Sequence, residues 1–414
     1  EITSRIRNKE NDRNYDGTSD YIYYGDMMSD EEVYLYFRQF SRYYYRPSYD
    51  SLWRGEKHFF TRKGLVLNKE KMSKDSNTYS FVLTDTNSIR KIHVQYRVNG
   101  GVLYGMRYVS EIGKTSEFGN TFFETFKPQE DTVVGLPFNQ NKGDVFLEDL
   151  YGEDSLAKDY ALQSMQMITF DKKHTKRVIG IIDGFKHKDF GVKERVHLIE
   201  QLGYLKHRAI MPYLESVDNR IGDTAQIQVA VLQALVNQRS KSATKLFAKL
   251  LESETPLVSQ SSVEYLTSSM SDSLIVYRDL FPFLLKFTGY PEYKTGIYVL
   301  MADMLDSNVL KPKDYKSFRK DLVREAKDGL KRVMAESHSE SGYDSYSRYS
   351  YSSSSHSEGM EAYNKLLIPF KNAKDVKEYF ERTKRLNSKP DLLNTSLQML
   401  EAGIDVEDTI WGHF

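Results

Sequence analysis

Histidine and carboxylate side chains are the residues of this chain that could bind a metal or transfer protons. The 414-residue sequence contains nine histidines, and no two have the H-x-x-x-H spacing that places two imidazoles on one helical face. The densest grouping is Asp183, His187 and Asp189 in IIDGFKHKDFG, where an imidazole and two carboxylates could hold a cation. Lys186 and Lys188 flank these side chains and would oppose a cation. We therefore interpret the segment as a solvated loop between helices and predict no metal site.

Other common catalytic patterns are absent from the sequence. Cysteine does not occur, which excludes disulfides, thiolate zinc sites and a cysteine nucleophile. Neither G-x-S-x-G nor G-x-x-x-x-G-K-[ST] is found. The run Asp85-Thr86-Asn87 begins like a calcium-binding loop, but Ile89 follows where a ligand is required and Arg90 where the bend requires glycine. We predict no catalytic residue and no cofactor, and expect that the chain is not an enzyme.

The composition argues against two classes of partner. The 58 basic and 58 acidic residues give a formal net charge of zero, whereas a nucleic-acid binder gathers a basic excess. No apolar run approaches the roughly 20 residues that span a bilayer, so we predict no transmembrane segment.

The absence of cysteine suits an oxidising compartment, which favours a periplasmic, cell-envelope or secreted location over a cytoplasmic one. The chain starts at Glu1 without a Met, so we expect it to be part of a longer chain.

A helix is predicted near the start of the chain, after a charged, flexible lead-in over residues 1–28. Ser29 and Glu32 form an S-x-x-E capping box, in which hydroxyl and carboxylate satisfy free backbone amides. The apolar residues that would then share one helical face are Val33, Tyr36, Phe37 and Phe40.

Alternating apolar residues next predict antiparallel strands, the first three of which are residues 59–61, 65–67 and 79–83. Residues 92–98 and 102–108 both alternate, and Asn99-Gly100-Gly101 between them predicts a tight hairpin. We expect one apolar face, covered by a helix over residues 116–126 that carries Phe118, Phe122 and Phe126 as a stripe. Residues 29–150 are thus predicted to form an α+β antiparallel module. The succession of strands, hairpin and aromatic helix resembles the PsbP/Mog1-like fold, which implies a fold and no activity.

Residues 151–336 change to helical periodicity, and their helix pairs recur. Leu198-Ile199-x-x-Leu202 is followed by Val231-Leu232-x-x-Leu235, a shift of about 33 residues. A helix pair cannot bury its apolar side alone, so such pairs stack into an array. The region resembles the HEAT/armadillo class of α-solenoids, and an irregular helical bundle is the alternative.

The remainder of the chain is predicted to interrupt and then resume this array. Residues 337–360 are rich in Ser and Tyr and poor in aliphatic residues, which predicts a disordered loop. Helical periodicity returns over residues 361–414, where we expect the array to be truncated.

These patterns favour a non-catalytic interaction scaffold that binds a protein or peptide through the helical-repeat surface. The expected inner helices are residues 196–205, 227–236 and 297–305. The polar or aromatic residues on them that could contact a partner are Gln201, Tyr204, Gln233 and Asn237.

Two alternatives remain open at this point. The chain could be the accessory, non-catalytic portion of a larger envelope-associated enzyme. Its first module could instead bind carbohydrate or the cell envelope through a stacking platform of aromatic rings, namely Tyr43, Tyr44, Tyr45, Tyr49 and Trp53.

Overall fold

The protein consists of two compact units, Glu1–Glu194 and Arg195–Phe414, and each is described by itself. The computed structural model describes residues 19–26, 31–61, 65–85, 88–128, 135–221, 224–339 and 352–406. The predicted boundary at residue 150 differs from this division, because the helices that follow it up to Glu194 belong to the first unit.

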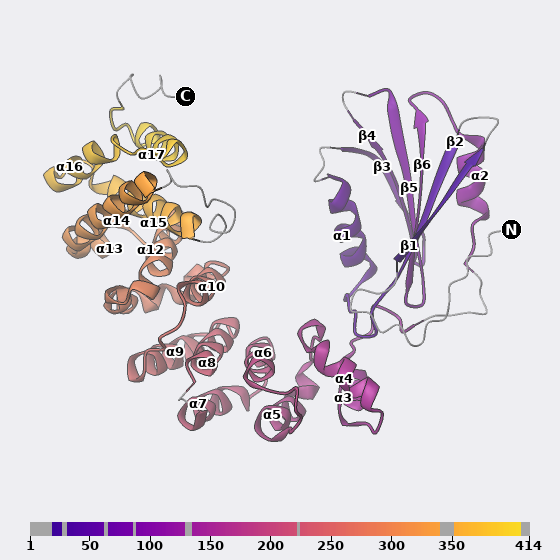
Figure 1. The fold of residues 1–414 in the computed structure, drawn as a ribbon, viewed down its shortest axis with the longest axis horizontal. Coiled ribbons are helices and arrows are strands. Elements are labelled where there is room, and N and C mark those ends of the chain that lie inside the picture. The colour runs from indigo at the N-terminus through magenta and orange to yellow at the C-terminus, as the bar shows by residue number, and fades with distance from the viewer. Residues whose placement is uncertain are drawn as a thin grey trace. The chain divides into compact units, whose positions relative to one another are not determined.

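The first unit contains a six-stranded antiparallel sheet with strand order β1-β2-β6-β5-β4-β3 (Figure 1). Its strands are β1 (Ser19–Asp26), β2 (Glu31–Gln39), β3 (Val66–Met72), β4 (Thr78–Thr84), β5 (Arg90–Asn99) and β6 (Val102–Glu111). The predicted hairpin is confirmed, with Asn99 opposite Val102 across β5 and β6. Gly100 has a φ of 58°, the left-handed conformation that a two-residue hairpin turn requires and that glycine adopts without a steric cost.

Strands β1 and β2 lie where the sequence predicted a lead-in and a helix. Strand β1 falls within residues 1–28, and β2 occupies the start of the predicted helix, whose cap residue Ser29 lies outside the described residues. In β2, Val33, Leu35 and Phe37 are buried and alternate with less buried neighbours, which is the period of a strand. The helix prediction is wrong because β1 and β6 supply β2 with backbone partners on both sides.

Helix α1 (Tyr49–Thr61) replaces the strand predicted at residues 59–61. Leu52 and Trp53 are buried in one core with β4 and β5, so packing on the sheet holds this segment helical. The strands predicted at residues 65–67 and 79–83 correspond to β3 and β4.

Both faces of the sheet are covered, one by α1 and the other by α2 (Glu117–Thr125) (Figure 1). Residues opposite each other in an antiparallel pair share a face, so Val98 and Leu103 face α1 while Tyr104 and Tyr108 face the other way. On that second face the ring of Phe123 lies 5.0 Å from that of Tyr108. The expectation of a single apolar face covered by residues 116–126 is therefore wrong, because the two-residue turn places the two alternating sets on opposite faces.

Three further helices complete the first unit: α3 (Gly143–Tyr151), α4 (Ser155–Gln163) and α5 (Thr175–Gly184). Tyr43, which follows β2, is fully buried, and its ring lies 5.5 Å from Phe146 and 5.4 Å from Tyr160. Its hydroxyl donates to Asp149 Oδ2 at 2.7 Å, and Arg42 pairs with the same carboxylate at 2.6 Å. Tyr43 thus joins the sheet to α3 and α4 as a core residue.

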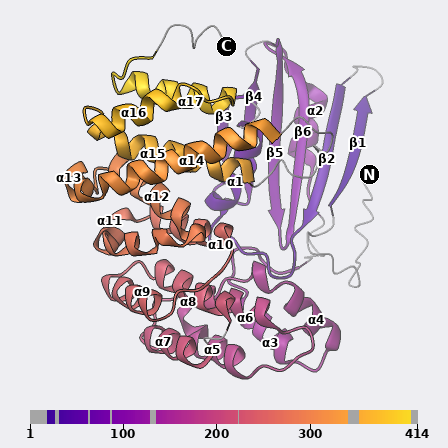
Figure 2. The ribbon, with the colours of Figure 1, turned by 60° about the vertical axis from the view of Figure 1, so that its left-hand side comes forward.

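The second unit is helical. Its helices are α6 (Val192–Leu202, which begins in the first unit), α7 (Ile210–Ile221), α8 (Ala225–Asn237), α9 (Lys241–Ser253), α10 (Gln260–Ser271), α11 (Leu274–Tyr277), α12 (Pro291–Asp306), α13 (Pro312–Tyr315), α14 (Arg319–Ser339), α15 (Ser352–Leu367), α16 (Lys374–Thr383) and α17 (Lys389–Glu401). Successive contacts place α8, α10, α12, α15 and α17 in one row, with α7, α9, α14 and α16 alongside it (Figure 2). The prediction of a helical second part is confirmed.

Helices occupy both ends of the segment, residues 337–360, that was predicted to be a Ser/Tyr-rich disordered loop. Helix α14 continues to Ser339 and α15 begins at Ser352, so both helices enter the predicted loop. The rest of that segment, residues 340–351, lies outside the described residues. Among the helices that the structure describes, none has the length and apolar character needed to cross a membrane.

Candidate partner-binding site

The four predicted contact residues lie where the end of α6 packs against α8. Gly203 allows this close approach, because a Cβ at that position would lie 2.6 Å from the carbonyl oxygen of Ala234. Asn237 Nδ2 donates to the carbonyl oxygen of Glu200 at 3.5 Å. The segment around Gln201 and Tyr204 is thereby held against α8.

Gln233 is not available to a partner at the surface. Its side chain is 1% exposed, and its Nε2 donates to Asn237 Oδ1 at 3.1 Å. Its Oε1 has no hydrogen-bond partner among the described residues. The prediction placed Gln233 at the surface from its polarity alone, whereas almost the whole of α8 is buried between its neighbours.

Tyr204 and Tyr265 are the exposed aromatic residues of this region. Each side chain is 56% exposed, Tyr204 just beyond α6 and Tyr265 in the middle of α10. Burial of part of its ring raises the pKa of Tyr265, and the neighbouring Tyr204 and Glu200 raise it further, so these three groups lie within electrostatic reach of one another. Burial also raises the pKa of Glu200. We call Glu200, Gln201, Tyr204, Asn237 and Tyr265 the α6–α10 patch.

Tyr265 is a patch residue that was not predicted from the sequence, although its spacing in α10 carried a signal. Val263, Leu266 and Met270 form the buried side of α10, and Tyr265 falls outside that set. A helical projection of α10 would have placed this tyrosine toward solvent. Its proximity to Tyr204 could not be read from the sequence, because it depends on α6, α8 and α10 packing in order.

The α6–α10 patch combines aromatic, amide and carboxylate side chains. Tyrosine rings provide apolar contact area and a hydroxyl that forms hydrogen bonds, and Glu200 adds an acceptor. The patch contains none of the nucleophile–base pairs on which covalent catalysis depends.

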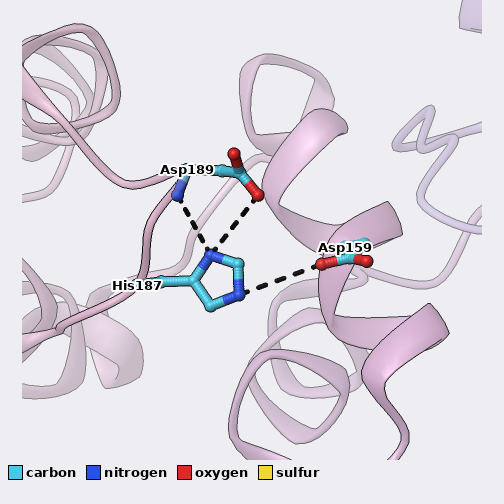
Figure 3. Close-up of side chains that lie close together, drawn as sticks. All are labelled: Asp159, His187 and Asp189. Carbon is cyan, nitrogen blue, oxygen red and sulfur yellow. Dashed lines mark hydrogen bonds and ion pairs between the residues drawn. The ribbon is translucent and has the colours of Figure 1, made fainter.

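A second cluster forms in the first unit around His187, in the loop between α5 and α6 (Figure 3). Nε2 of His187 lies 3.9 Å from Asp159 Oδ1, and Nδ1 lies 3.7 Å from Asp189 Oδ2. The backbone amide of Asp189 donates to Nδ1 at 3.2 Å. Asp183 is not part of this group; its place is taken by Asp159 of α4, which is distant in sequence.

A small hollow of about 70 Å³ lies between α10, α12, α14 and α15. Lys294 and Glu325 line it and pair with each other at 2.5 Å. This volume holds a few water molecules rather than a substrate.

No protein-family model matches the chain, and no curated protein sequence matches it. Among solved structures, the chain is similar to one described as "Lipid-protein interactions in lipovitellin", with 10% sequence identity and a TM-score of 0.26. The similarity covers 94% of this chain and 43% of that chain, so the protein spans less than half of that chain's length. At this TM-score the similarity supports no statement about fold or function.

Proposed function

We propose that the protein is a non-catalytic interaction scaffold that binds a protein or peptide segment at the α6–α10 patch. The observation that carries this proposal is the pair of half-exposed tyrosines, Tyr204 and Tyr265. They lie within electrostatic reach of Glu200, on a surface formed by α6, α8 and α10. Large, rigid aromatic side chains that are partly exposed to solvent and lie beside a polar group are typical of the centre of a protein interface.

We also propose that the second unit is an α-solenoid of the HEAT/armadillo type. The row of contacts from α8 to α17 supports this, because each of these helices packs on the next member of the row, and α8 and α15 also pack on helices alongside it. Ion pairs also recur with sequence separations of 33 or 34 residues, which matches the repeat in the sequence; they are Glu215–Lys249, Arg239–Asp272 and Glu252–Lys286. Exposed pairs contribute little energy, so they report the spacing of the repeats rather than stabilise them.

The chemistry of the patch favours a partner segment with a cationic or amide side chain. A guanidinium or ammonium group can stack on a tyrosine ring and pair with Glu200 at the same time. The raised pKa of Glu200 reflects its partial burial, and a partner cation would compensate for that burial.

The carbohydrate-binding alternative receives less support from the structure. Tyr43 and Trp53, two members of the proposed aromatic platform, are buried in the core of the first unit. Trp53 Nε1 donates to the backbone oxygen of Ser76 at 3.0 Å, so its polar edge is used inside the protein.

Affinity capture from the native host, with the full chain as bait, tests the proposal. A partner that binds the patch should bind the Tyr204→Ala/Tyr265→Ala variant at least roughly 30-fold more weakly, because interface hot spots cost about 2 kcal/mol or more. Ile275→Ala is the matched control, since Ile275 is 81% exposed and lies on α11, outside the patch. Equal recovery of every captured protein by the double variant and the control would contradict the proposal.

A further inference from the structure

The cluster of Asp159, His187 and Asp189 has the composition of a metal site. Each residue offers one donor atom, and the three donors lie within 4.8 Å of one another. Imidazole nitrogen and carboxylate oxygen both bind Zn²⁺ in proteins, and water can take the remaining positions around the cation. We propose that these residues bind a divalent transition-metal cation of the Zn²⁺ class.

The distances require only small movements. Three atoms within 4.8 Å of one another share a point no more than about 2.8 Å from each, whereas zinc bonds to nitrogen and oxygen are about 2.0–2.2 Å. The Asp159 and Asp189 side chains are 46% and 59% exposed, so both carboxylates are free to rotate toward a cation. The His187 side chain is only 20% exposed and is the more constrained ligand.

The surroundings of His187 hold its ring between the two carboxylates (Figure 3). The Phe185 ring stacks on the imidazole with centroids 6.4 Å apart and an interplanar angle of 21°. The Asp189 amide donates to Nδ1, which leaves the proton of a neutral ring on Nε2, the nitrogen that faces Asp159. A cation at Nε2 replaces that proton, which is released to solvent, and Asp189 reaches it by rotation of its side chain.

The donor set selects the class of cation. Calcium prefers six to eight oxygen ligands, which three residues with one nitrogen do not supply. Imidazole favours Zn²⁺, Cu²⁺ and Ni²⁺ instead. Lys186 and Lys188 are exposed and flank the histidine, so they lower the affinity without occupying the donor positions. A bound cation would link α4 to the loop that precedes α6.

Zinc titration of the full chain by calorimetry tests this site. Wild type should bind one more equivalent of Zn²⁺ than His187→Ala or the isosteric Asp159→Asn, and this equivalent should weaken as the pH falls because protons compete for the ligands. His207→Ala is the matched control: His207 Nδ1 also accepts a backbone amide, that of Ala209 at 3.1 Å, in a comparable loop. The control should retain every equivalent that wild type binds.

Two outcomes would overturn the proposal. One is a wild type that binds no zinc, or that binds as many equivalents as both His187→Ala and Asp159→Asn. The other is an equal loss in His207→Ala, which would show that the titration reports non-specific histidine binding. Because the site lies in the first unit and the α6–α10 patch in the second, either outcome leaves the partner-binding proposal untouched.

Discussion

His93, a side chain of the sheet, makes the stability of the first unit depend on pH. It lies on the α2 face of the sheet, where its ring stacks on Tyr108 at 4.3 Å and Nε2 lies 3.2 Å from Ser110 Oγ. Burial, together with the charge of the nearby Lys91, lowers the pKa of His93 to about 4. The folded protein therefore holds this ring neutral at pH values at which an unfolded chain would protonate it.

The first unit should accordingly lose stability as the pH falls from 6.5 to 4. In that range the unfolded chain takes up a proton at residue 93 and the folded chain does not, which favours unfolding; above pH 6.5 both are neutral and the contribution disappears. Urea unfolding at pH 7 and pH 5, followed by Trp53 fluorescence in a Trp411→Phe background, measures the free energy of unfolding of the first unit at each pH. His93→Gln should show a smaller loss between the two pH values than the parent. The exposed His58→Gln should behave like the parent, and an unchanged pH dependence in His93→Gln would exclude this mechanism.

At the scale of elements, the amide side chain of Gln238 connects the end of α6 to α8. Gln238 Nε2 contacts the carbonyl oxygens of Leu202 at 3.2 Å, Gly203 at 2.9 Å and Leu205 at 2.9 Å. Gly203 and Leu205 lie just beyond α6, where the carbonyl groups have no partner in a helix, so the Gln238 side chain holds this segment against α8. The same junction carries part of the α6–α10 patch.

Gln238→Ala should destabilise the second unit by about 1–3 kcal/mol, because it removes the side-chain donor to the carbonyl oxygens of Gly203 and Leu205. Thermal unfolding followed by circular dichroism at the helical band measures the change. Gln226→Ala is the matched control, since Gln226 is exposed on the first turn of α8 and its loss should cost within about 0.5 kcal/mol. Equal unfolding temperatures for the two variants would show that the contacts of Gln238 do not stabilise this junction.

The whole molecule divides into two units, and this division has a thermal consequence. Units with separate cores can unfold in separate transitions. The first unit depends on the β5–β6 hairpin, whose turn includes Gly100 at a φ of 58°. The second unit contains no strand among its described residues and relies on helix packing.

Replacing Asn99-Gly100 with Val-Val should lower the unfolding temperature of the first unit alone. A β-branched residue at this positive φ costs about 1–3 kcal/mol, or roughly 2–4 °C for each kcal/mol in a unit of this size. Differential scanning calorimetry of the full chain should show one transition moved and the other unchanged. Gly55→Ala in α1 is the control, because a Cβ there meets nothing within 4 Å. A common shift of both transitions would mean that the units unfold as one.

Local patterns were sufficient for much of this architecture. The hairpin followed from two alternating segments around Asn99-Gly100-Gly101, and the helical character of residues 155–253 followed from apolar spacing. Such signals are readable because they depend on neighbours a few residues apart, through turn geometry or through one helical face.

The tertiary structure decided the features that depend on distant residues. The segment of β2 satisfies a helical pattern as well as a strand pattern, and pairing with β1 and β6 selects the strand. Gln233 is polar but buried, because α8 is enclosed by helices on several sides. Tyr265 beside Tyr204, and Asp159 beside His187, come from elements far apart in the chain. The sequence alone thus determined the periodicity of most elements and the absence of cysteine chemistry. The fold decided which side chains lie next to one another, because burial and proximity arise only when separate elements pack.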